Sequence, residues 1–291
     1  MSSEMYSLAS RVKLANGATM PRIHFGLYMI PASKTRQAVR WALEAGYRGF
    51  DSAQMYGNER ETGAAIREAL RSSTSEDDGG RLAREDVFYT TKLASCSADY
   101  QQVRASIRKS VDACGLGYVD LFLLHSPYGG REARLTSWRA LEDAVEAGEV
   151  RMAGVSNYGV RHIEELMASH PKVHPVVNQI EVHPFNTNTE IREVCAKYNI
   201  VVEAYAPLAR GMRMKDRTVL SLADKYHCTP AQLLIRWSLQ HGMVPLPKSA
   251  KRDRIISNAQ IGGFEISQED MKALDDLDEH LVTDWDPTDA A

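Results

Sequence analysis

Short apolar segments alternate with amphipathic stretches along most of the chain. RIHFGLY, YRGFDSA, VFYTTKL and VDLFLLHS each have the length of a strand, and VRMAGVSNY, VVNQIEVHP, IVVEAYAPL and MVPLPKS follow them. The stretches between them have apolar residues at helical spacing, such as Val39, Ala42 and Leu43 in TRQAVRWALEAG, where Gly46 is predicted as the C-cap. Strands separated by helices of about a dozen residues indicate parallel strands with helical crossovers.

Eight such units in 291 residues predict an α/β fold, a (β/α)8 TIM barrel, whose usual size is about 250 residues. Before them, RVKLANGATM has Asn16-Gly17 between alternating apolar residues, which predicts an N-terminal β-hairpin. A doubly wound sheet is the alternative, but no G-x-G-x-x-G follows the first strand. No linker divides the sequence, so we expect a single domain over residues 1–291, with a polar surface loop at residues 72–86.

Composition and charge exclude several classes of function. Hydrophobic residues make up 44% and charged residues 25% of the chain, as in ordinary soluble proteins. The net charge is −3, and no run of Lys and Arg is long enough for a nucleic-acid surface. No apolar run has the length of a membrane span, and the N-terminus lacks the apolar core of a signal peptide. The widely spaced cysteines predict free thiols, so we expect a cytoplasmic protein, a monomer without nucleic-acid or membrane partners.

Polar residues follow the apolar strands, where a β/α barrel places its catalytic groups. In chain order they are Asp51, Lys92, His125, Ser156, Asn157, Gln179, Tyr205 and Lys248, with Tyr56 in the loop after the second strand. A single polar residue at a strand end is more often a solvated cap. Burying this many polar and ionisable groups at one mouth is costly unless they have a role, so their convergence predicts a functional site.

Four of these side chains together predict a proton donor. A phenol with a pKa near 10 is a poor acid at neutral pH. A neighbouring ammonium favours the phenolate and lowers that pKa, and a carboxylate anchors the ammonium. We therefore predict Tyr56 as a general acid whose pKa is lowered by Lys92, with Asp51 as the anchor. His125 would donate a second hydrogen bond to the oxygen of a carbonyl, which is then ready to accept hydride.

These motifs resemble the aldo-keto reductase superfamily over nearly the whole chain. GFDSAQMYGNE resembles the family's Asp/Tyr signature, YTTKL its lysine segment and LFLLHSP its histidine segment. GVSNY, NQIEVHP, YAPL and PLPKSAKRDRIISN resemble its cofactor segments, in the family's order. The resemblance implies a barrel that binds NADPH across the carboxyl ends of its strands. It also implies reduction of an aldehyde or ketone to the alcohol, with Tyr56 as proton donor.

The resemblance further implies which residues contact the cofactor. The segments after the fifth, sixth and seventh strands supply Ser156, Asn157, Gln179, Tyr205 and Leu208. The first three would hydrogen-bond the nicotinamide carboxamide, and the tyrosine would stack on its ring. The segment after the eighth strand supplies Lys248, Ser249, Arg254 and Asn258 for the 2′-phosphate and adenine. Lysine and arginine suit a dianionic phosphate, and arginine also stacks on a base, so NADPH is the expected cofactor.

Three positions depart from the family's pattern. Leu27 lacks a hydroxyl that could contact the cofactor, and Ala206 stands where serine is common. Ser126 stands where many relatives have a bulky aromatic residue, so we expect an open pocket with Tyr28 and Trp285 as apolar walls. An open pocket discriminates weakly between substrates. The expected substrates are therefore a broad range of small to medium aldehydes and activated ketones.

Two other classes of function remain open from the sequence. The first is a binding or regulatory role, which some members of the family have. The second is a class I aldolase with Lys92 as the Schiff-base nucleophile, in which Asp51 and Tyr56 have no obvious task. No metal is expected, because the histidines near prolines lack the helical spacing of ligands: His170, His174 and His183.

Overall fold

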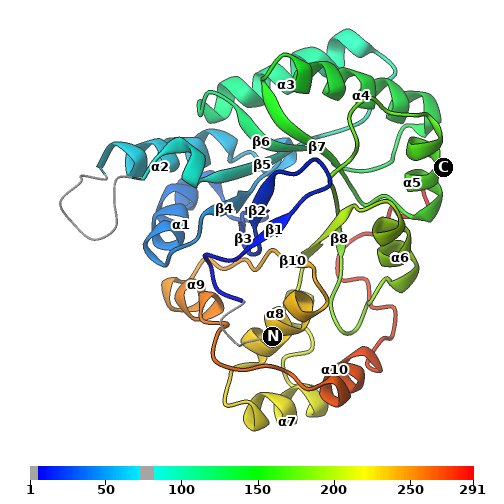
Figure 1. Ribbon diagram of the computed structural model, residues 1–291. Coiled ribbons are helices and arrows are strands. Elements are labelled where there is room, and N and C mark those ends of the chain that lie inside the picture. The colour runs from blue at the N-terminus through cyan, green and yellow to red at the C-terminus, as the bar shows by residue number, and fades with distance from the viewer. Residues whose placement is uncertain (1–5, 73–81) are drawn as a thin grey trace.

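The computed structural model describes residues 6–72 and 82–291 and forms the predicted barrel (Figure 1). Its strands are β3 (His24–Gly26), β4 (Gly49–Asp51), β5 (Phe88–Leu93), β6 (Val119–Leu124), β7 (Val150–Ser156), β8 (Val177–Glu181), β9 (Val201–Tyr205) and β10 (Val244–Pro245). All neighbouring strands are parallel, and their order in the sheet is their order in the chain. A hydrogen bond of 3.1 Å from Gly26 N to Pro247 O joins the first strand to the segment after the last.

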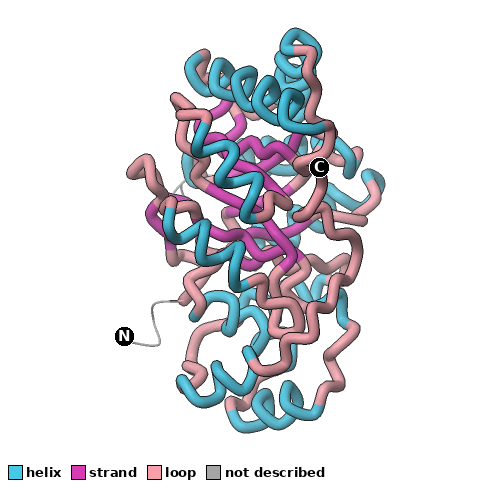
Figure 2. Tube along the Cα trace, turned by 90° about the vertical axis from the view of Figure 1, so that its right-hand side faces the viewer, coloured by secondary structure: helices cyan, strands magenta, loops and turns pink. Residues whose placement is uncertain are grey.

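Helices cover the outside of these strands, as the side view in Figure 2 shows. They are α1 (Ala32–Glu44), α2 (Glu59–Ser72), α3 (Tyr100–Cys114), α4 (Gly130–Glu146), α5 (Val160–Ala168), α6 (Thr189–Lys197), α7 (Arg217–Lys225), α8 (Pro230–Gln240), α9 (Arg252–Ala259) and α10 (Gln268–Asp275). Apolar periodicity did not predict α7, α9 and α10, which are short, with 9, 8 and 8 residues. Most of the predicted surface loop, residues 73–81, lies outside the described residues. In the described part of the chain, no helix combines the length and hydropathy that a membrane span needs.

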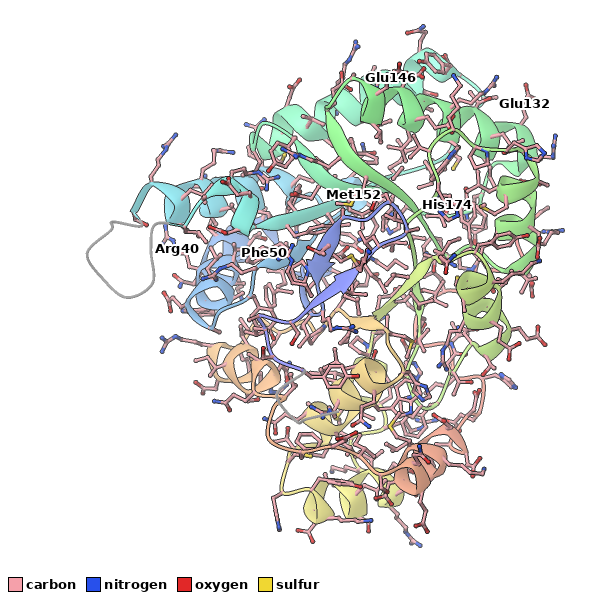
Figure 3. All side chains as sticks on the ribbon, in the orientation of Figure 1. Arg40, Phe50, Glu132, Glu146, Met152 and His174 are labelled. Atoms are coloured by element: carbon pink, nitrogen blue, oxygen red, sulfur yellow. The ribbon has the colours of Figure 1, made fainter. Side chains whose placement is uncertain are left out.

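The predicted hairpin closes the amino end of the barrel. It consists of β1 (Arg11–Lys13) and β2 (Thr19–Pro21), which pair antiparallel, and Figure 1 shows it lying across the strands. Its buried Val12 and Met20 pack in one cluster with inward-facing residues of the strands, including Leu121 and Met152. Met152 is labelled beside the hairpin in Figure 3. This half of the barrel interior is therefore mainly apolar.

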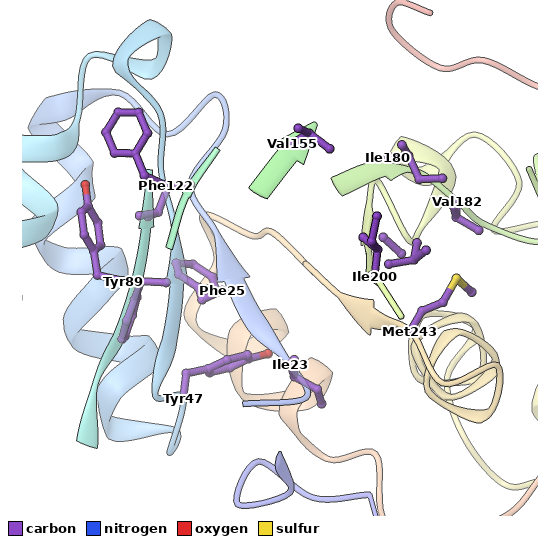
Figure 4. Close-up of a cluster of buried hydrophobic side chains, with 14 of the residues drawn as sticks. Ile23, Phe25, Tyr47, Tyr89, Phe122, Val155, Ile180, Val182, Ile200 and Met243 are labelled. Carbon is purple, nitrogen blue, oxygen red and sulfur yellow. The ribbon is translucent and has the colours of Figure 1, made fainter. Parts of the chain in front are cut away.

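Strand residues alternate between the barrel interior and the layer under the helices. In β5, Phe88 belongs to the interior cluster and Tyr89 to the outer one, where Figure 4 shows it near Phe122 of β6. Lys92 has the same parity as Phe88, so it also faces the interior. The same alternation in β6 turns Leu123 and then His125 inward. The outer apolar layer thus fixes which polar side chains enter the barrel.

A glycine in β4 makes room for an interior histidine. His24 of β3 is fully buried, and a Cβ atom built on Gly49 would lie 2.2 Å from its Cδ2 atom. The space taken by the imidazole, rather than an unusual backbone conformation, therefore requires glycine at this position.

We predict that Gly49→Ala lowers the free energy of unfolding by about 1–3 kcal/mol, the usual cost of overpacking a core. His24→Ala removes the clashing ring, so the double variant should be more stable than the sum of the two single changes predicts. Urea unfolding followed by circular dichroism measures both effects. Gly262→Ala is the matched control, because its Cβ would meet only Tyr6 O at 3.8 Å. If the losses of unfolding free energy in the two single variants add up to that of the double variant, the contact between position 49 and His24 is contradicted.

Candidate active site

Polar side chains fill the end of the barrel opposite the hairpin. Strands β4, β5, β8 and β9 direct Asp51, Lys92, Gln179 and Glu203 inward, and none of the four is more than 4% exposed. Buried polar groups cost free energy unless they are hydrogen-bonded. The partners of these four side chains therefore decide what the site can do.

Lys92 lies at the centre of this group. Its Nζ atom is 2.7 Å from Asp51 Oδ1, 2.8 Å from Ser52 O and 3.3 Å from the hydroxyl of Tyr56. An ammonium group has three N–H donors, so each donor has one acceptor. The Tyr56 oxygen accepts from Lys92, and its own hydrogen is left to donate to another molecule.

A short 3-10 helix holds Tyr56 over Lys92. This helix, η2 (Gln54–Tyr56), is anchored by the amide of Gln54. Gln54 Nε2 donates to Ser106 O at 3.0 Å and to Ser110 Oγ at 2.9 Å, both on α3, while Oε1 accepts from Ala94 N. This role of Gln54 was not predicted from the sequence, where the glutamine lies two residues before the signature tyrosine.

Loss of solvent sets the pKa of Tyr56. The residue as a whole is only half-buried, but its hydroxyl group is desolvated by burial. This desolvation raises the pKa well above its ordinary value, and the carboxylate of Asp51 raises it further. The expected net lowering of the pKa of Tyr56 is not found, because desolvation and the charge of Asp51 outweigh the effect of the Lys92 ammonium. Tyr56 therefore keeps its proton at neutral pH, as a donor must.

His125 lies across from Tyr56, with ring centroids 5.8 Å apart and planes at 74°. Burial, and then the nearby charge of Lys92, lower the pKa of His125 to about 3. The imidazole is therefore neutral at physiological pH, with one N–H donor and one acceptor nitrogen. Its Nδ1 atom is buried and has no hydrogen-bond partner among the described residues. A neutral ring of this kind can donate to a carbonyl oxygen without adding charge.

The residues predicted to hold the nicotinamide form a connected cluster beside His125. Asn157 Nδ2 donates to His125 O at 2.9 Å and to Ser156 Oγ at 3.2 Å, and Asn157 Oδ1 accepts from the Tyr205 hydroxyl at 2.9 Å. Ser156 Oγ donates to Gln179 O at 2.8 Å. Asn157 has a φ of 60°, which asparagine tolerates better than most residues. The structure thus brings all four predicted residues together.

Both N–H groups of the Gln179 side chain are used inside the barrel. Gln179 Nε2 lies 2.8 Å from Asp51 Oδ2 and 2.7 Å from Glu203 Oε2. Only Oε1, an acceptor, is left for a ligand. Glu203 and its neighbour His24 were not predicted from the sequence as part of this site. Period-two alternation could have found Glu203, since it lies two residues before Tyr205 in an otherwise apolar strand.

The predicted phosphate residues follow β10. Lys248 and Arg254 are exposed, whereas Ser249 and Asn258 are buried. Partial burial and the nearby positive charge of Arg210 lower the pKa of Lys248. Helix α9 begins beside them, and no side chain caps its amino end. Cations next to an uncapped helix N-terminus suit an anion.

Leu208, which was also predicted to contact the cofactor, lies in the loop after β9. It is half-buried and packs against the outer apolar core. The loop around it is strained, since Ala206, Ala209 and Arg210 have φ values of 45°, 45° and 49°.

Aromatic rings surround the mouth of the site. Centroids of Tyr28 and Tyr56 are 5.1 Å apart, those of His125 and Trp285 6.1 Å, and those of Tyr128 and Trp285 5.7 Å. Both predicted walls, Tyr28 and Trp285, therefore lie next to the central groups. Tyr128, which is 48% exposed, was missed in the sequence, where it is an aromatic residue soon after the fourth barrel strand.

Ser126, which was predicted as a substrate contact, is 4% exposed as a residue. The carbonyl oxygen of Ser126 accepts a hydrogen bond of 3.4 Å from Cys96 Sγ. Desolvation raises the pKa of the Cys96 thiol to about 11. The thiol stays protonated near neutral pH, which argues against a reactive cysteine here.

The C-terminal segment carries Trp285 to the mouth. Asp284 accepts from the Tyr28 hydroxyl at 2.9 Å and pairs with Arg210 at 3.0 Å. Glu181 accepts from Thr283 N at 3.0 Å. The chain then runs on to α5, beside which the C-terminus lies in Figure 1. These contacts hold a segment without regular secondary structure over the end of the barrel.

Comparisons with known proteins agree with this geometry. The model of the Aldo/keto reductase family matches residues 22–279. The chain is 47% identical to an uncharacterized oxidoreductase of Schizosaccharomyces pombe, over 96% of this chain and 98% of that protein. It is 38% identical to the glyoxal reductase of Bacillus subtilis, over 93% and 94% of the two chains. The crystal structure of MGS-M4, an aldo-keto reductase from a deep-sea metagenome library, matches with a TM-score of 0.86 and 33% identity, over 97% and 99%. The chain belongs to the aldo/keto reductase family of oxidoreductases.

Proposed function

We propose that the protein is an NADPH-dependent aldo-keto reductase, an alcohol:NADP⁺ oxidoreductase that reduces an aldehyde or ketone to the alcohol with Tyr56 as general acid. One observation carries this proposal. Lys92 donates to Asp51, Ser52 O and Tyr56, so the phenolic hydrogen of Tyr56 is free to be donated at the mouth of the barrel, beside the neutral ring of His125.

The chain's own residues handle the oxygen of the substrate. His125 donates a hydrogen bond to the carbonyl oxygen and orients it, and Tyr56 transfers its proton to that oxygen. The phenolate left on Tyr56 is stabilised by the Lys92 ammonium, whose charge is balanced by Asp51. NADPH, when bound, supplies the hydride that the carbonyl carbon receives. The tyrosine then recovers a proton from solvent.

Several groups around the mouth of the barrel that are free to bind a ligand fit NADPH. Lys248 and Arg254, next to the uncapped start of α9, offer charge and backbone N–H groups to a 2′-phosphate. Gln179 offers only its Oε1 acceptor, which suits the amide N–H₂ of a carboxamide. Ser156, Asn157 and the ring of Tyr205 lie beside it.

An aldolase reaction on Lys92 is not supported. A Schiff base requires a neutral amine with a free lone pair. Lys92 Nζ is fully buried and donates to three acceptors, one of them the carboxylate of Asp51. A purely regulatory protein would not need a site in which Tyr56, Lys92, Asp51 and His125 are arranged to donate a proton, so this role is not favoured.

The substrates we propose are small to medium aldehydes and activated ketones, over a broad range. The aromatic rings of Tyr28, Tyr128 and Trp285 offer flat apolar surface rather than charged groups. A relative that is 38% identical is named a glyoxal reductase, which makes glyoxal a suitable first probe. We further propose that the protein is cytoplasmic, which the four free thiols support. We also propose that it is a monomer.

We predict that Tyr56→Phe lowers kcat by about 10²–10⁴-fold, the usual contribution of general acid catalysis. Lys92→Met should act similarly, because it removes the ammonium that stabilises the phenolate. Loss of NADPH absorbance with glyoxal measures kcat, and fluorescence quenching should show nearly unchanged NADPH binding. Tyr198→Phe, on the outer helix layer, is the control and should retain the parent rate. A Tyr56→Phe enzyme with more than about a tenth of the parent kcat would show that another group is the acid.

We predict that NADPH binds more tightly than NADH, and that Arg254→Ala weakens NADPH binding by about tenfold, as expected for one charge-assisted contact. The preference should shrink with added salt. Arg252→Ala is the matched control, since the neighbouring Arg252 is exposed and pairs with Glu44 at 3.3 Å. Fluorescence quenching measures the dissociation constants of NADPH and NADH for the parent protein and both variants. Equal affinity of the parent for NADPH and NADH would reject the phosphate site.

We predict that Trp285→Ala raises KM for aromatic aldehydes such as benzaldehyde by about tenfold, because a buried aromatic contact is lost. The kcat for glyoxal, which is too small to span the rings, should change less than twofold by this reasoning. Steady-state kinetics with both substrates test this. Equal effects on both substrates would mean that Trp285 is a structural residue of the C-terminal segment.

A further inference from the structure

Two titratable groups that the reaction above does not use lie beneath Lys92. His24 of β3 and Glu203 of β9 are both fully buried, and His24 Nδ1 is 3.4 Å from Glu203 Oε1. Neither of these two atoms has a hydrogen-bond partner among the described residues. Two unpartnered polar atoms that face each other at this distance can be satisfied by one shared proton.

This pair is connected to the proposed catalytic groups. Glu203 Oε2 accepts from Gln179 Nε2 at 2.7 Å, and the same nitrogen donates to Asp51 Oδ2 at 2.8 Å. Asp51 Oδ1 accepts from Lys92. The contacts run in order through His24, Glu203, Gln179, Asp51, Lys92 and Tyr56.

Burial and the neighbouring Asp51 favour the neutral form of Glu203. Two carboxyl groups share the amide of Gln179, and the ammonium of Lys92 contacts Asp51 alone of the two. Burial, and then the charge of Asp51, raise the pKa of Glu203 to about 8. Burial lowers the pKa of His24 to about 3, so its ring is neutral. Near pH 7 the pair therefore has a protonated carboxyl group facing a neutral imidazole.

We propose that Glu203 and His24 are a positioning pair for the reductase reaction. Glu203 donates its proton to Nδ1 of His24 and, through the Gln179 amide, holds Asp51 in the orientation that fixes Lys92 under Tyr56. This inference rests on the proposed function of Tyr56. The proton on Glu203 Oε1 leaves Oε2 free to accept from Gln179, whose other N–H binds Asp51.

A pH dependence follows from this arrangement. When Glu203 ionises, a second negative charge lies close to Asp51 and makes the phenolate of Tyr56 harder to form. The rate should therefore fall as the pH rises through about 8. The groups that act on the pair are Asp51 (β4), Lys92 (β5) and Gln179 (β8), and the backbone of Pro21 and the charge of Arg11, both on the hairpin, act on His24.

The first experiment compares pH profiles of kcat with glyoxal. In the parent, kcat should fall by about tenfold between neutral and strongly alkaline pH, whereas in Glu203→Gln, which cannot ionise, most of this fall should disappear. Glu203→Leu cannot bind Gln179 and should lower kcat at all pH values, with the KM for glyoxal and the Kd for NADPH little changed. Glu142→Gln is the control: this buried glutamate accepts from Val173 N on the outer layer, and the variant should keep the parent profile.

The second experiment needs no substrate. Infrared difference spectra recorded across the alkaline range should show the C=O stretch of a protonated carboxyl group that disappears near pH 8. That band should be missing in Glu203→Gln and present in Glu142→Gln. Should Glu203→Gln fail to fold, His24→Gln provides the test, because a different acceptor for the proton should shift the band. An unshifted band would overturn the contact.

The outcomes separate the two proposals. A parent protein that reduces no carbonyl compound overturns the reductase assignment, whatever the infrared band shows. A parent that reduces glyoxal overturns the positioning pair if its Glu203→Gln variant keeps both the band and the alkaline fall in kcat. Equal kcat values for Glu203→Gln and Glu203→Leu would also overturn it, because the leucine removes the hydrogen bonds that the glutamine retains.

Discussion

A lysine ammonium with no exposed surface is the constraint on which this barrel depends. An unpaired charge in a protein interior is very costly, so Lys92 must have a charge partner and acceptors for all its N–H groups. Asp51, Ser52 O and Tyr56 meet that need from the adjoining strand and the turn that follows it. The same contacts that make Lys92 tolerable also leave Tyr56 as a proton donor. Structure and proposed chemistry thus rest on one set of hydrogen bonds.

Inside the barrel, these polar side chains lie at one end and a mainly apolar layer lies at the other. The hairpin and the amino ends of most strands form an apolar cluster, against which His24 of β3 packs, whereas the carboxyl ends carry Asp51 and Lys92. The pair of Glu203 and His24 is neutral near pH 7, because burial raises the pKa of the carboxyl group to about 8 and lowers that of the imidazole to about 3. Gly49 belongs to the same arrangement, because any larger residue would meet the ring of His24.

The mouth of the site depends on contacts between distant parts of the chain. Tyr28 and Asp284 are 256 residues apart in sequence, yet they share a hydrogen bond that holds the C-terminal segment over the strands. That segment brings Trp285 to His125, and Tyr128 packs on its other side. The loops therefore form the surface that a substrate would contact, whereas the strands fix the positions of the polar groups below it.

The sequence by itself determined the eight strands, the hairpin and the family motifs, because period-two and helical apolar patterns are local properties of the chain. It also predicted which polar residues meet at the mouth, since parallel barrel strands end on the same side. It did not predict that the pKa of Tyr56 is raised overall, because desolvation depends on how closely η2 lies against the barrel. It did not predict α7, α9 and α10, whose short amphipathic turns depend on packing against the barrel. The pairing of His24 with Glu203 came only from the tertiary structure, because closing the barrel places β3 beside β10, so that only one strand separates β3 from β9.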